Sequence, residues 1–361
     1  MTRTRTAGLL AGSGLAVAAG VLLDRRIGKR RRETALAGEP ELGSLRGDVH
    51  EVTADDGVVL HAEVDERAPY GTDAELDRDR ATVVLVHGFS LSMDCWHFQR
   101  QAFRGKRRMV LYDQRSHGRS GRSTEENATI DQLGRDLERV LSTLTAEDEK
   151  VVLVGHSMGG MSIVALAEHR PELFGDKVVG VGLISTTAGG QRTHKIVAKY
   201  VPDALGRRAL ERGLLVAGER ERLLELVRES RSAVGLWIVR QFAFGPGPVP
   251  TAHVAFVDKM INETPLKVLV EFIPQFDALD KFHVLEAFTR VPTLIACGTE
   301  DKLTSLGHSR KLHSRIPGSE LLELDGTGHM SIMESADEVD ERLEALFAEA
   351  DLRIHESAGR T

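Results

Sequence analysis

The chain has 361 residues, enough for one large domain or for a domain that carries a substantial insertion. Apolar residues make up 41% and charged residues 28%, which is typical of a folded globular protein, and the net charge of -7 gives no electrostatic footprint for nucleic-acid binding. The two cysteines, Cys95 and Cys297, match no disulfide framework and no CxxC metal or redox spacing, and they suit a reducing compartment.

An uncharged apolar stretch, residues 7–23, lies near the N-terminus with basic residues on both sides. As a helix it spans roughly 25 Å, slightly less than the ~30 Å hydrocarbon core of a bilayer. The denser basic cluster, Arg25 to Arg32, follows the stretch, where it opposes translocation of a secretory signal peptide. We therefore expect residues 1–32 to form an anchor-like segment with the folded domain on the cytoplasmic side of a membrane. There are two alternatives. The protein is soluble and cytoplasmic with residues 1–32 as a loose tail, or these residues are a signal peptide.

The folded region begins with alternating polar and apolar residues around Asp56-Gly57, which predicts a β-hairpin over residues 48–66. Strands and helical patterns then follow one another to the end of the chain. Apolar strands are expected within 82–88, 107–120, 150–156, 177–185, 291–298 and 319–326, and helices within 129–144, 161–172 and 335–350.

This alternation predicts an α/β fold with a mostly parallel, doubly wound sheet. The interval between residues 190 and 289 departs from it, because it carries helical patterns without a clear strand and is far longer than a usual connection. We expect a core of residues 48–189 and 290–349 and a helical insertion at 190–289.

The stretch VVLVGHSMGG, residues 151–160, places Ser157 between a buried strand and a helix, with glycines on either side. Such a G-x-S-x-G turn either is an ordinary strand end or holds the serine exposed as a nucleophile. A nucleophilic serine also requires a base, an acid that orients the base, and donors for the developing oxyanion.

The remaining parts of such a site occur in the chain. His329 lies on a glycine-rich loop between the last strand and the terminal helix, and is the candidate base. Asp301 follows the preceding strand and is the candidate acid, with the adjacent Glu300 as the fallback. The backbone N–H groups of Phe89 and Met158 are the candidate oxyanion donors, since Met158 starts a helix.

Two further histidines, His87 and His156, lie next to these donors and could be mistaken for the base. We expect both to be packing and hydrogen-bonding residues, because the base must come from a separate loop to reach Ser157.

Together these segments resemble the α/β-hydrolase superfamily over roughly residues 48–349. The resemblance is carried by HGF 87–89, DQRSHGRS 113–120, GHSMGG 155–160, GTED 298–301 and GTGHM 326–330. It implies an α/β-hydrolase fold, a Ser157–His329–Asp301 catalytic triad and a cap domain formed by the insertion. Ser116 is a departure, because many members have glycine at this position of the D-x-R-G-x-G-x-S pattern.

By this resemblance the chain is expected to be a serine hydrolase that cleaves a carboxylic ester through an acyl-enzyme. The same triad can serve a lipase, a cofactor-free perhydrolase or haloperoxidase, or a C–C bond hydrolase, and some relatives are ligand-binding signalling receptors with residual hydrolysis. Dehalogenases and epoxide hydrolases of the superfamily use an aspartate nucleophile, so Ser157 argues against both. No HExxH, Walker loop or GxGxxG motif is present, and we expect no metal or cofactor.

The expected partner is a small acyl or ester substrate, with no nucleic acid. Apolar and aromatic residues of the insertion suggest an apolar pocket, although most of them must pack its helices together. The loop FGPGPVP, residues 244–250, breaks any helix and could act as a hinge or lid. The aromatic and apolar candidates are Leu236, Trp237, Phe242, Phe244, Phe256, Phe272 and Phe276.

Overall fold

The computed structural model describes residues 40–68, 80–191 and 233–358. The chain divides into two units, residues 1–44 and 45–361, and all elements named below belong to the second. The expected anchor segment, including residues 7–23, and the first part of the helical insertion lie outside the described residues. Within the described ranges, no helix combines the length and the apolar character needed to cross a bilayer.

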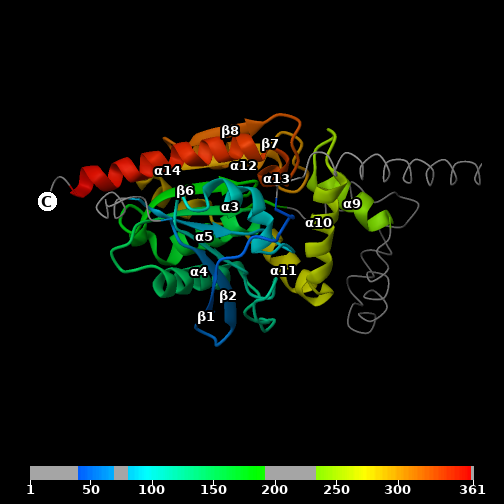
Figure 1. The fold of residues 1–361 in the computed structure, drawn as a ribbon, viewed down its shortest axis with the longest axis horizontal. Coiled ribbons are helices and arrows are strands. Elements are labelled where there is room, and N and C mark those ends of the chain that lie inside the picture. The colour runs from blue at the N-terminus through cyan, green and yellow to red at the C-terminus, as the bar shows by residue number, and fades with distance from the viewer. Residues whose placement is uncertain (1–39, 69–79, 192–232, 359–361) are drawn as a thin grey trace, which may run out of the picture. The chain divides into compact units, whose positions relative to one another are not determined.

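Eight strands form one sheet in the order β1-β2-β4-β3-β5-β6-β7-β8 (Figure 1). The first two pair antiparallel as the predicted hairpin, β2 is antiparallel to β4, and every other neighbouring pair is parallel. The prediction of a mostly parallel, doubly wound sheet is therefore confirmed. The strands are β1 Asp48–Thr53, β2 Val59–Asp65, β3 Thr82–Val86, β4 Met109–Tyr112, β5 Val151–His156, β6 Val178–Ile184, β7 Thr293–Gly298 and β8 Glu320–Leu324.

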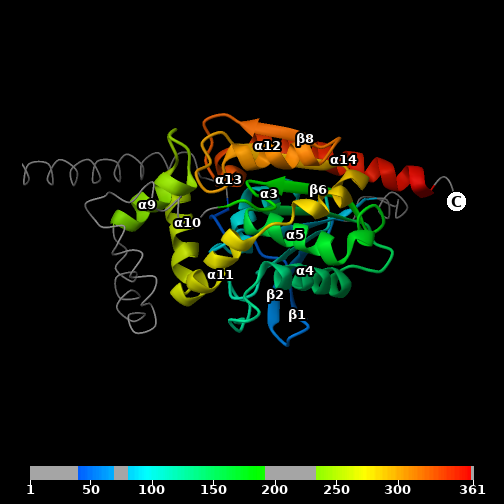
Figure 2. The same ribbon diagram turned by 180° about the vertical axis from the view of Figure 1, so that it is seen from behind.

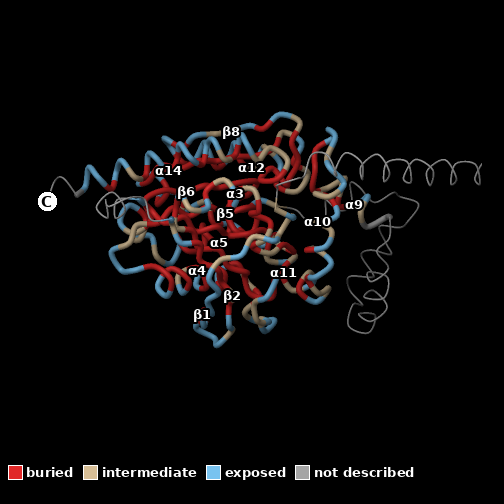
Figure 3. The backbone as a smooth tube through the Cα atoms, in the orientation of Figure 1, coloured by how far each residue is buried: buried red, intermediate tan, exposed pale blue. Residues whose placement is uncertain are grey.

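Helices cover both faces of the sheet, which is why the central strands are apolar at nearly every position (Figures 1 and 2). Alternate residues of the central strands β3, β4, β5 and β7 belong to opposite cores. Val83 and Leu85 of β3 join the core formed with α3 (His97–Phe103), α13 (Ser331–Glu334) and α14 (Ala336–Ala358). Val84 and Val86 join the core formed with α4 (Ile130–Leu144), α5 (Met158–His169) and α12 (Leu306–Arg315). Figure 3 shows these strands as the most buried part of the molecule.

Short 3-10 helices connect several of these elements. They are η1 (Met93–Trp96), η2 (Pro171–Leu173) after α5, and η4 (Phe282–Arg290) before β7. The loop that joins β3 to η1, residues 87–92, is called the β3 loop below. Residues Met93, Cys95 and Trp96 of η1 are buried, so the chain that leaves β3 is packed into the core.

The described part of the insertion between β6 and β7 is helical. It consists of α9 (Ala233–Ala243), α10 (Thr251–Glu263) and α11 (Leu266–Ala278), drawn in yellow-green to yellow in Figure 1. Residues 244–250 separate α9 from α10 as a non-helical loop, as the sequence predicts. The carboxyl ends of the parallel strands and these helices border the region where the candidate site residues lie.

Candidate active site

Ser157 lies on a sharp turn between β5 and α5. Its backbone has φ 53° and ψ -117°, a combination that a residue with a side chain rarely adopts. The turn is held by hydrogen bonds from Ser157 N to Ile184 O (2.9 Å) and from Thr186 Oγ1 to Ser157 O (2.6 Å). The strain therefore persists because neighbouring strands and loops fix the backbone on both sides of the hydroxyl.

The imidazole of His329 lies between Ser157 and Asp301. His329 Nε2 is 3.0 Å from Ser157 Oγ, and His329 Nδ1 is 2.9 Å from Asp301 Oδ2. A carboxylate only accepts hydrogen bonds, so the proton of the neutral ring is on Nδ1, and Nε2 presents a lone pair to the serine hydroxyl. The three residues that the sequence singles out are thus joined by a continuous chain of hydrogen bonds.

Asp301 is completely enclosed and well supplied with donors. Its Oδ1 accepts hydrogen bonds from Leu303 N (2.8 Å) and Thr304 N (2.9 Å), and Thr304 Oγ1 lies 3.0 Å from Oδ2. Burial alone would raise the pKa of this carboxyl, but the His329 imidazole and the two backbone donors lower it below its ordinary value. Asp301 therefore stays ionised and can stabilise a positive charge on the ring.

Glu300, the alternative acid, does not take this position. Its backbone N–H donates to Thr327 O at 2.9 Å, and the carboxylate bonded to His329 is that of Asp301. Thr304 was not among the sequence candidates, although its hydroxyl lies 3.3 Å from His329 Nδ1 and donates to Ser185 O at 2.6 Å. The short segment Asp301-x-x-Thr304 is the only local signal that points to it.

The two candidate oxyanion donors lie at the ends of different elements. Met158 is the first residue of α5, where the backbone N–H has no acceptor within the helix. Phe89 lies in the loop after β3, three residues beyond Val86. This loop and the start of α5 approach each other closely, since a Cβ on Gly88 would lie 3.2 Å from Ser157 Cβ. The arrangement can present N–H groups to an anion held beside the serine.

A buried polar contact fixes the β3 loop to α5. His87 Nδ1 lies 2.7 Å from Gly88 O and donates to it, so Nε2 is free to accept a hydrogen bond from Gln114 N at 2.8 Å. The Gln114 side chain donates from Nε2 to His87 O (2.6 Å) and accepts at Oε1 from Ser162 Oγ of α5 (2.7 Å). Gln114, which the sequence patterns did not reveal, therefore links the two segments that carry Phe89 and Met158.

The histidines that were expected to be packing residues are enclosed and neutral. Burial lowers the pKa of His87 to about 4 and that of His156 to about 3. His156 Nε2 donates to the carbonyl oxygen of His329 at 3.0 Å, so it contacts the backbone of the candidate base. Neither ring is part of the hydrogen-bond chain at Ser157.

The loop after β4, residues 113–120, explains the departure at Ser116. This residue has φ 67°, in the left-handed region that favours glycine. Its hydroxyl accepts a hydrogen bond from Ser123 N at 2.9 Å. Gly118 in the same loop also has a positive φ, 52°, and a Cβ there would lie 2.3 Å from the Asp113 carboxylate.

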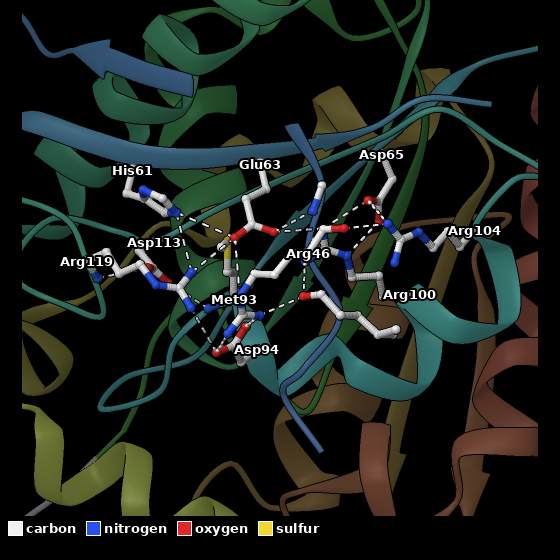
Figure 4. A network of polar contacts seen from close by, with 12 residues as sticks. Arg46, His61, Glu63, Asp65, Met93, Asp94, Arg100, Arg104, Asp113 and Arg119 are labelled. Atoms are coloured by element: carbon white, nitrogen blue, oxygen red, sulfur yellow. Dashed lines mark hydrogen bonds and ion pairs between the residues drawn. The ribbon is translucent and has the colours of Figure 1, made fainter. Parts of the chain in front are cut away.

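A network of charged side chains joins β2, α3 and the loop after β4 (Figure 4). Buried Glu63 and Asp65 of β2 both pair with buried Arg100 of α3, at 2.8 Å and 2.6 Å. Burial opposes ionisation of Glu63, but the hydrogen bonds from Gly47 N and Arg100 lower its pKa below the ordinary value. More exposed arginines extend the network on its solvent side: Arg46, Arg104 and Arg119.

Asp113 connects this network to the loop that carries Phe89. Its two carboxylate oxygens accept hydrogen bonds from Met93 N and Arg119 N, both at 2.8 Å. Met93 is the first residue of η1, directly after the β3 loop (Figure 4). The end of that loop is therefore fixed to β4 and, through Arg119, to β2.

Some of the apolar residues of the insertion reach the site. The ring of Phe89 contacts Phe276 and Phe272 of α11, with centroids 5.0 Å and 6.1 Å apart, and that of His117 at 5.6 Å. Phe244 is completely buried, whereas Trp237 of α9 is 59% exposed. Two of the sequence candidates, Phe272 and Phe276, therefore contact the candidate oxyanion loop.

The described residues contain no group of three or more His, Cys, Asp or Glu side chains that could hold a metal ion. Cys95 and Cys297 are both free thiols and both buried, as the sequence predicts for ordinary small residues. Burial, with the Asp301 charge nearby, raises the pKa of Cys297 to about 12, so it is a poor nucleophile.

Comparisons with known proteins agree with this architecture. Residues 83–342 match the alpha/beta hydrolase family. The hydrolase YugF of Bacillus subtilis (strain 168) is 27% identical over 251 residues, which cover 70% of this chain and 84% of that protein. An esterase from Thermogutta terrifontis has a similar fold with a TM-score of 0.61 and 20% identity, covering 84% of this chain and 99% of the esterase.

A bromoperoxidase from Bacillus anthracis is equally similar in fold, with a TM-score of 0.61 and 22% identity over 83% of this chain and 99% of that one. At these identities the solved structures establish the fold and not the substrate. The family match covers more than half of the sequence, and the chain belongs to the alpha/beta hydrolase family.

Proposed function

We propose that the protein is a serine hydrolase that cleaves carboxylic esters, with Ser157 as nucleophile, His329 as base and Asp301 as the acid that orients it. The observation that carries the proposal is the hydrogen-bond chain of 3.0 Å and 2.9 Å from Ser157 Oγ through His329 to Asp301. Family membership and the fold shared with an esterase support the same reaction class.

In the first step His329 Nε2 takes the proton of Ser157 Oγ while the oxygen attacks the ester carbonyl. The ring becomes positively charged, and the ionised Asp301 stabilises it through the Nδ1–H hydrogen bond. The backbone N–H groups of Phe89 and Met158 stabilise the oxyanion of the tetrahedral intermediate. His329 then returns the proton to the departing alcohol, which leaves an acyl-enzyme on Ser157.

In the second step water takes the place of the alcohol. His329 removes a proton from the water, the hydroxide attacks the acyl carbonyl, and the protonated ring returns the proton to Ser157 as the carboxylic acid departs. In this proposed mechanism the chain's own residues carry out every proton transfer.

We propose further that the substrate is a small ester with an apolar part, and that the helical insertion at 190–289 is the cap over the site. Support comes from Phe272 and Phe276 of α11, whose rings contact Phe89 next to the proposed oxyanion donor. Burial of an apolar group against such rings favours binding by the hydrophobic effect.

The test is hydrolysis of p-nitrophenyl esters of increasing acyl length, together with labelling by a fluorophosphonate. Ser157→Ala and His329→Ala are expected to abolish turnover, and Ser157→Ala to abolish labelling, while the circular dichroism spectrum is unchanged. His50→Ala, at an exposed position of β1, is the control and keeps full activity. Full activity in either site variant contradicts the proposed triad.

Two further assays separate the other activities that this scaffold serves: bromination with peroxide, and thermal stabilisation by added ligands. Peroxide-dependent bromination faster than ester hydrolysis would indicate a perhydrolase, and a chain without turnover that is stabilised by an added ligand would indicate a binding protein. Either result replaces the esterase proposal.

We also propose that residues 7–23 attach the chain to a membrane with its folded domain on the cytoplasmic side. The support is the sequence alone, because these residues lie outside the described ranges. Fractionation of the full chain tests it: release from membranes without salt or detergent contradicts an anchor.

A further inference from the structure

The loop that carries His329 contacts the helical insertion through one acidic side chain. Glu334 is the last residue of α13, five positions after His329. Its Oε2 accepts hydrogen bonds from Gly328 N (2.9 Å) and Gly245 N (3.0 Å), and its Oε1 lies 3.1 Å from the same Gly245 N. One carboxylate therefore binds the backbone next to the proposed base and the backbone of the insertion at once.

The two backbones that Glu334 joins are in direct contact. A Cβ on Gly245 would lie 1.9 Å from Gly326 O, and a Cβ on Gly328 would lie 2.3 Å from Phe244 C. Neither glycine has a positive φ, so the short approach, and not an unusual backbone conformation, is what requires glycine at both positions. Any side chain at either place would separate the segments.

Further hydrogen bonds run between the same two regions. Met330 N, one residue after His329, donates to Ala243 O at 2.7 Å. Lys302 Nζ, one residue after Asp301, donates to Gln241 O at 2.6 Å. The end of α9 is thus bonded to the neighbours of both the proposed base and the proposed acid.

The insertion side of this contact is itself held in shape. Arg240 of α9 donates from its guanidinium to the carbonyl oxygens of Gly245 and Gly247. The loop from residue 244 to 247 is therefore tied back to its own helix, and a displacement of α9 would carry Gly245 with it.

A carboxylate suits this position because it only accepts hydrogen bonds and has two oxygens for the two backbone donors. Both donors are amides with no other acceptor nearby in the contacts described, so an apolar residue at 334 would leave them without a partner at a tightly packed place. Loss of these hydrogen bonds would displace Gly328, the residue directly before His329 in the chain.

We propose that Glu334 is a positioning residue that couples the helical insertion to catalysis. Its carboxylate binds Gly245 N and Gly328 N at the same time. The His329 imidazole is therefore held in line with Ser157 and Asp301 only while the end of α9 is in contact with the His329 loop. The proposal rests on the proposed function of His329 as the base. It assigns Glu334 no contact with the substrate.

The first test compares Glu334→Ala, Glu334→Gln and the control Glu338→Ala, which alters an exposed glutamate one turn further on. Glu334→Ala is expected to lower both kcat and the rate of fluorophosphonate labelling about 10- to 100-fold per folded molecule, with KM changed less than about twofold. Glu334→Gln keeps one acceptor oxygen and is expected to recover most of the rate, whereas Glu338→Ala leaves it unchanged.

The second test separates the contact from the carboxylate. Gly245→Ala forces the insertion away from Gly326 and keeps the Glu334 side chain, although the new Cβ would also lie 3.0 Å from Glu334 Oε1. Gly247→Ala, two residues on, meets no atom within 4 Å. We expect Gly245→Ala to lower kcat and the rate of fluorophosphonate labelling as Glu334→Ala does, and Gly247→Ala to leave both unchanged. The double variant Glu334→Ala/Gly245→Ala is expected to be no slower than the worse single one, because both changes break the same contact.

Hydrogen exchange gives a readout that does not depend on activity. In Glu334→Ala, amides of residues 242–248 and 325–333 are expected to exchange faster together, with the sheet strands unchanged. Faster exchange in only one of the two segments, or an unchanged labelling rate in Glu334→Ala, overturns the coupling. A wild-type chain that neither labels nor hydrolyses esters instead overturns the proposed function, while the exchange result still decides whether the contact exists.

Discussion

The two loops that flank Ser157 are held in different ways. The β3 loop, residues 87–92, is fixed to the sheet and to α5 by buried polar groups: His87, Gln114 and the Asp113 carboxylate. The ring of Phe89 in this loop packs against Phe272 and Phe276 of the insertion. The loop of His329, in contrast, is bonded to the insertion by directional backbone hydrogen bonds and by Glu334.

This difference indicates which half of the site responds to the insertion. Ring packing tolerates small shifts with little loss of energy, whereas a hydrogen bond weakens steeply with distance and angle. A movement of α9 therefore changes the position of the proposed base more than that of the proposed oxyanion donors. The following predictions break one side or the other, in order of decreasing expected effect.

Asp301→Asn acts on the loop of His329 and is expected to have the largest effect on activity. The amide can donate to His329 Nδ1 and so favours the tautomer whose Nε2 carries the proton, which cannot accept the proton of Ser157. We expect kcat for ester hydrolysis to fall on the order of 10³–10⁴-fold with the fold intact. Glu300→Gln is the matched control, and a large loss there instead would reassign the acid.

Arg100→Met breaks the charged network that joins β2 to α3. It leaves Glu63 and Asp65 buried without their cation, which is expected to cost about 3–5 kcal/mol in free energy of unfolding. Arg104→Met, at a half-exposed arginine 3.6 Å from Asp65, is expected to cost less than about 1 kcal/mol. Urea denaturation measures both, and equal losses would show that burial of the pair does not matter.

Low pH is expected to lower the free energy of unfolding through two buried histidines, His87 in the β3 loop and His117, whose ring contacts Phe89 of that loop. Burial lowers the pKa of His87 to about 4 and of His117 to about 3, below the 6.5 of an exposed ring. Between pH 6.5 and 4 the unfolded chain therefore binds more protons than the folded chain, so the free energy of unfolding decreases as the pH falls. The contribution of each neutral ring to this free energy is complete above pH 6.5, and for His87 about 3 kcal/mol is lost as the pH falls toward 4.

His117→Phe sharpens this test, because it keeps a ring against Phe89 and removes one titrating group. We expect the variant to be slightly less stable at pH 7.5, since it lacks the hydrogen bond to Arg115 O, but to lose less free energy of unfolding between pH 7.5 and 5. An unchanged pH slope in urea denaturation would contradict the role of the buried ring.

Gln114→Leu is the mildest of these changes and loosens the oxyanion side. It removes the two hydrogen bonds that join His87 O to Ser162 Oγ through the amide. We expect kcat to fall about tenfold, less than the 10²–10³ expected for loss of a complete oxyanion donor, with KM nearly unchanged. Ser162→Ala removes only one of these bonds, and a greater loss there than in Gln114→Leu would contradict a bridging role.

The sequence alone predicted the features that depend on local pattern and chain order. The hairpin around Gly57, the buried strands and the helical stripe of α4 each have a periodicity that identifies them. Ser157, Asp301 and His329 each follow a strand whose carboxyl end faces the same edge of the sheet, so their meeting could be expected from topology.

Elements without a strong apolar stripe escaped prediction. Within α12 only Ser309 and Leu312 are buried, which leaves no helical period to detect. The terminal helix α14 runs on to Ala358, eight residues beyond the predicted end, through a mostly exposed segment in which Leu352 is exposed and Ile354 is buried. With so few buried apolar positions, these segments show no helical period in the sequence.

Contacts between distant residues also had no signal in the sequence. Glu334 and Gly245 are 89 positions apart, and Arg100 and Asp65 are 35 apart. A glutamate or an arginine in a helix is usually a solvated residue, so only the packed structure distinguishes these from their exposed neighbours.

The glycines around Ser157 have a consequence for motion during turnover. A Cβ on Gly159 would lie 2.0 Å from Val86 O, and one on Gly160 would lie 2.5 Å from Thr186 Cγ2, so the first turn of α5 packs directly against β3 and the loop after β6. The backbone that carries Ser157 is therefore closely packed, and in the proposed reaction we expect adjustment to a bound ester to fall to the imidazole and to the acyl group. Enzyme variants with altered chain-length preference should therefore arise from changes in α9 and α11, and not from changes in the helix that begins at residue 158.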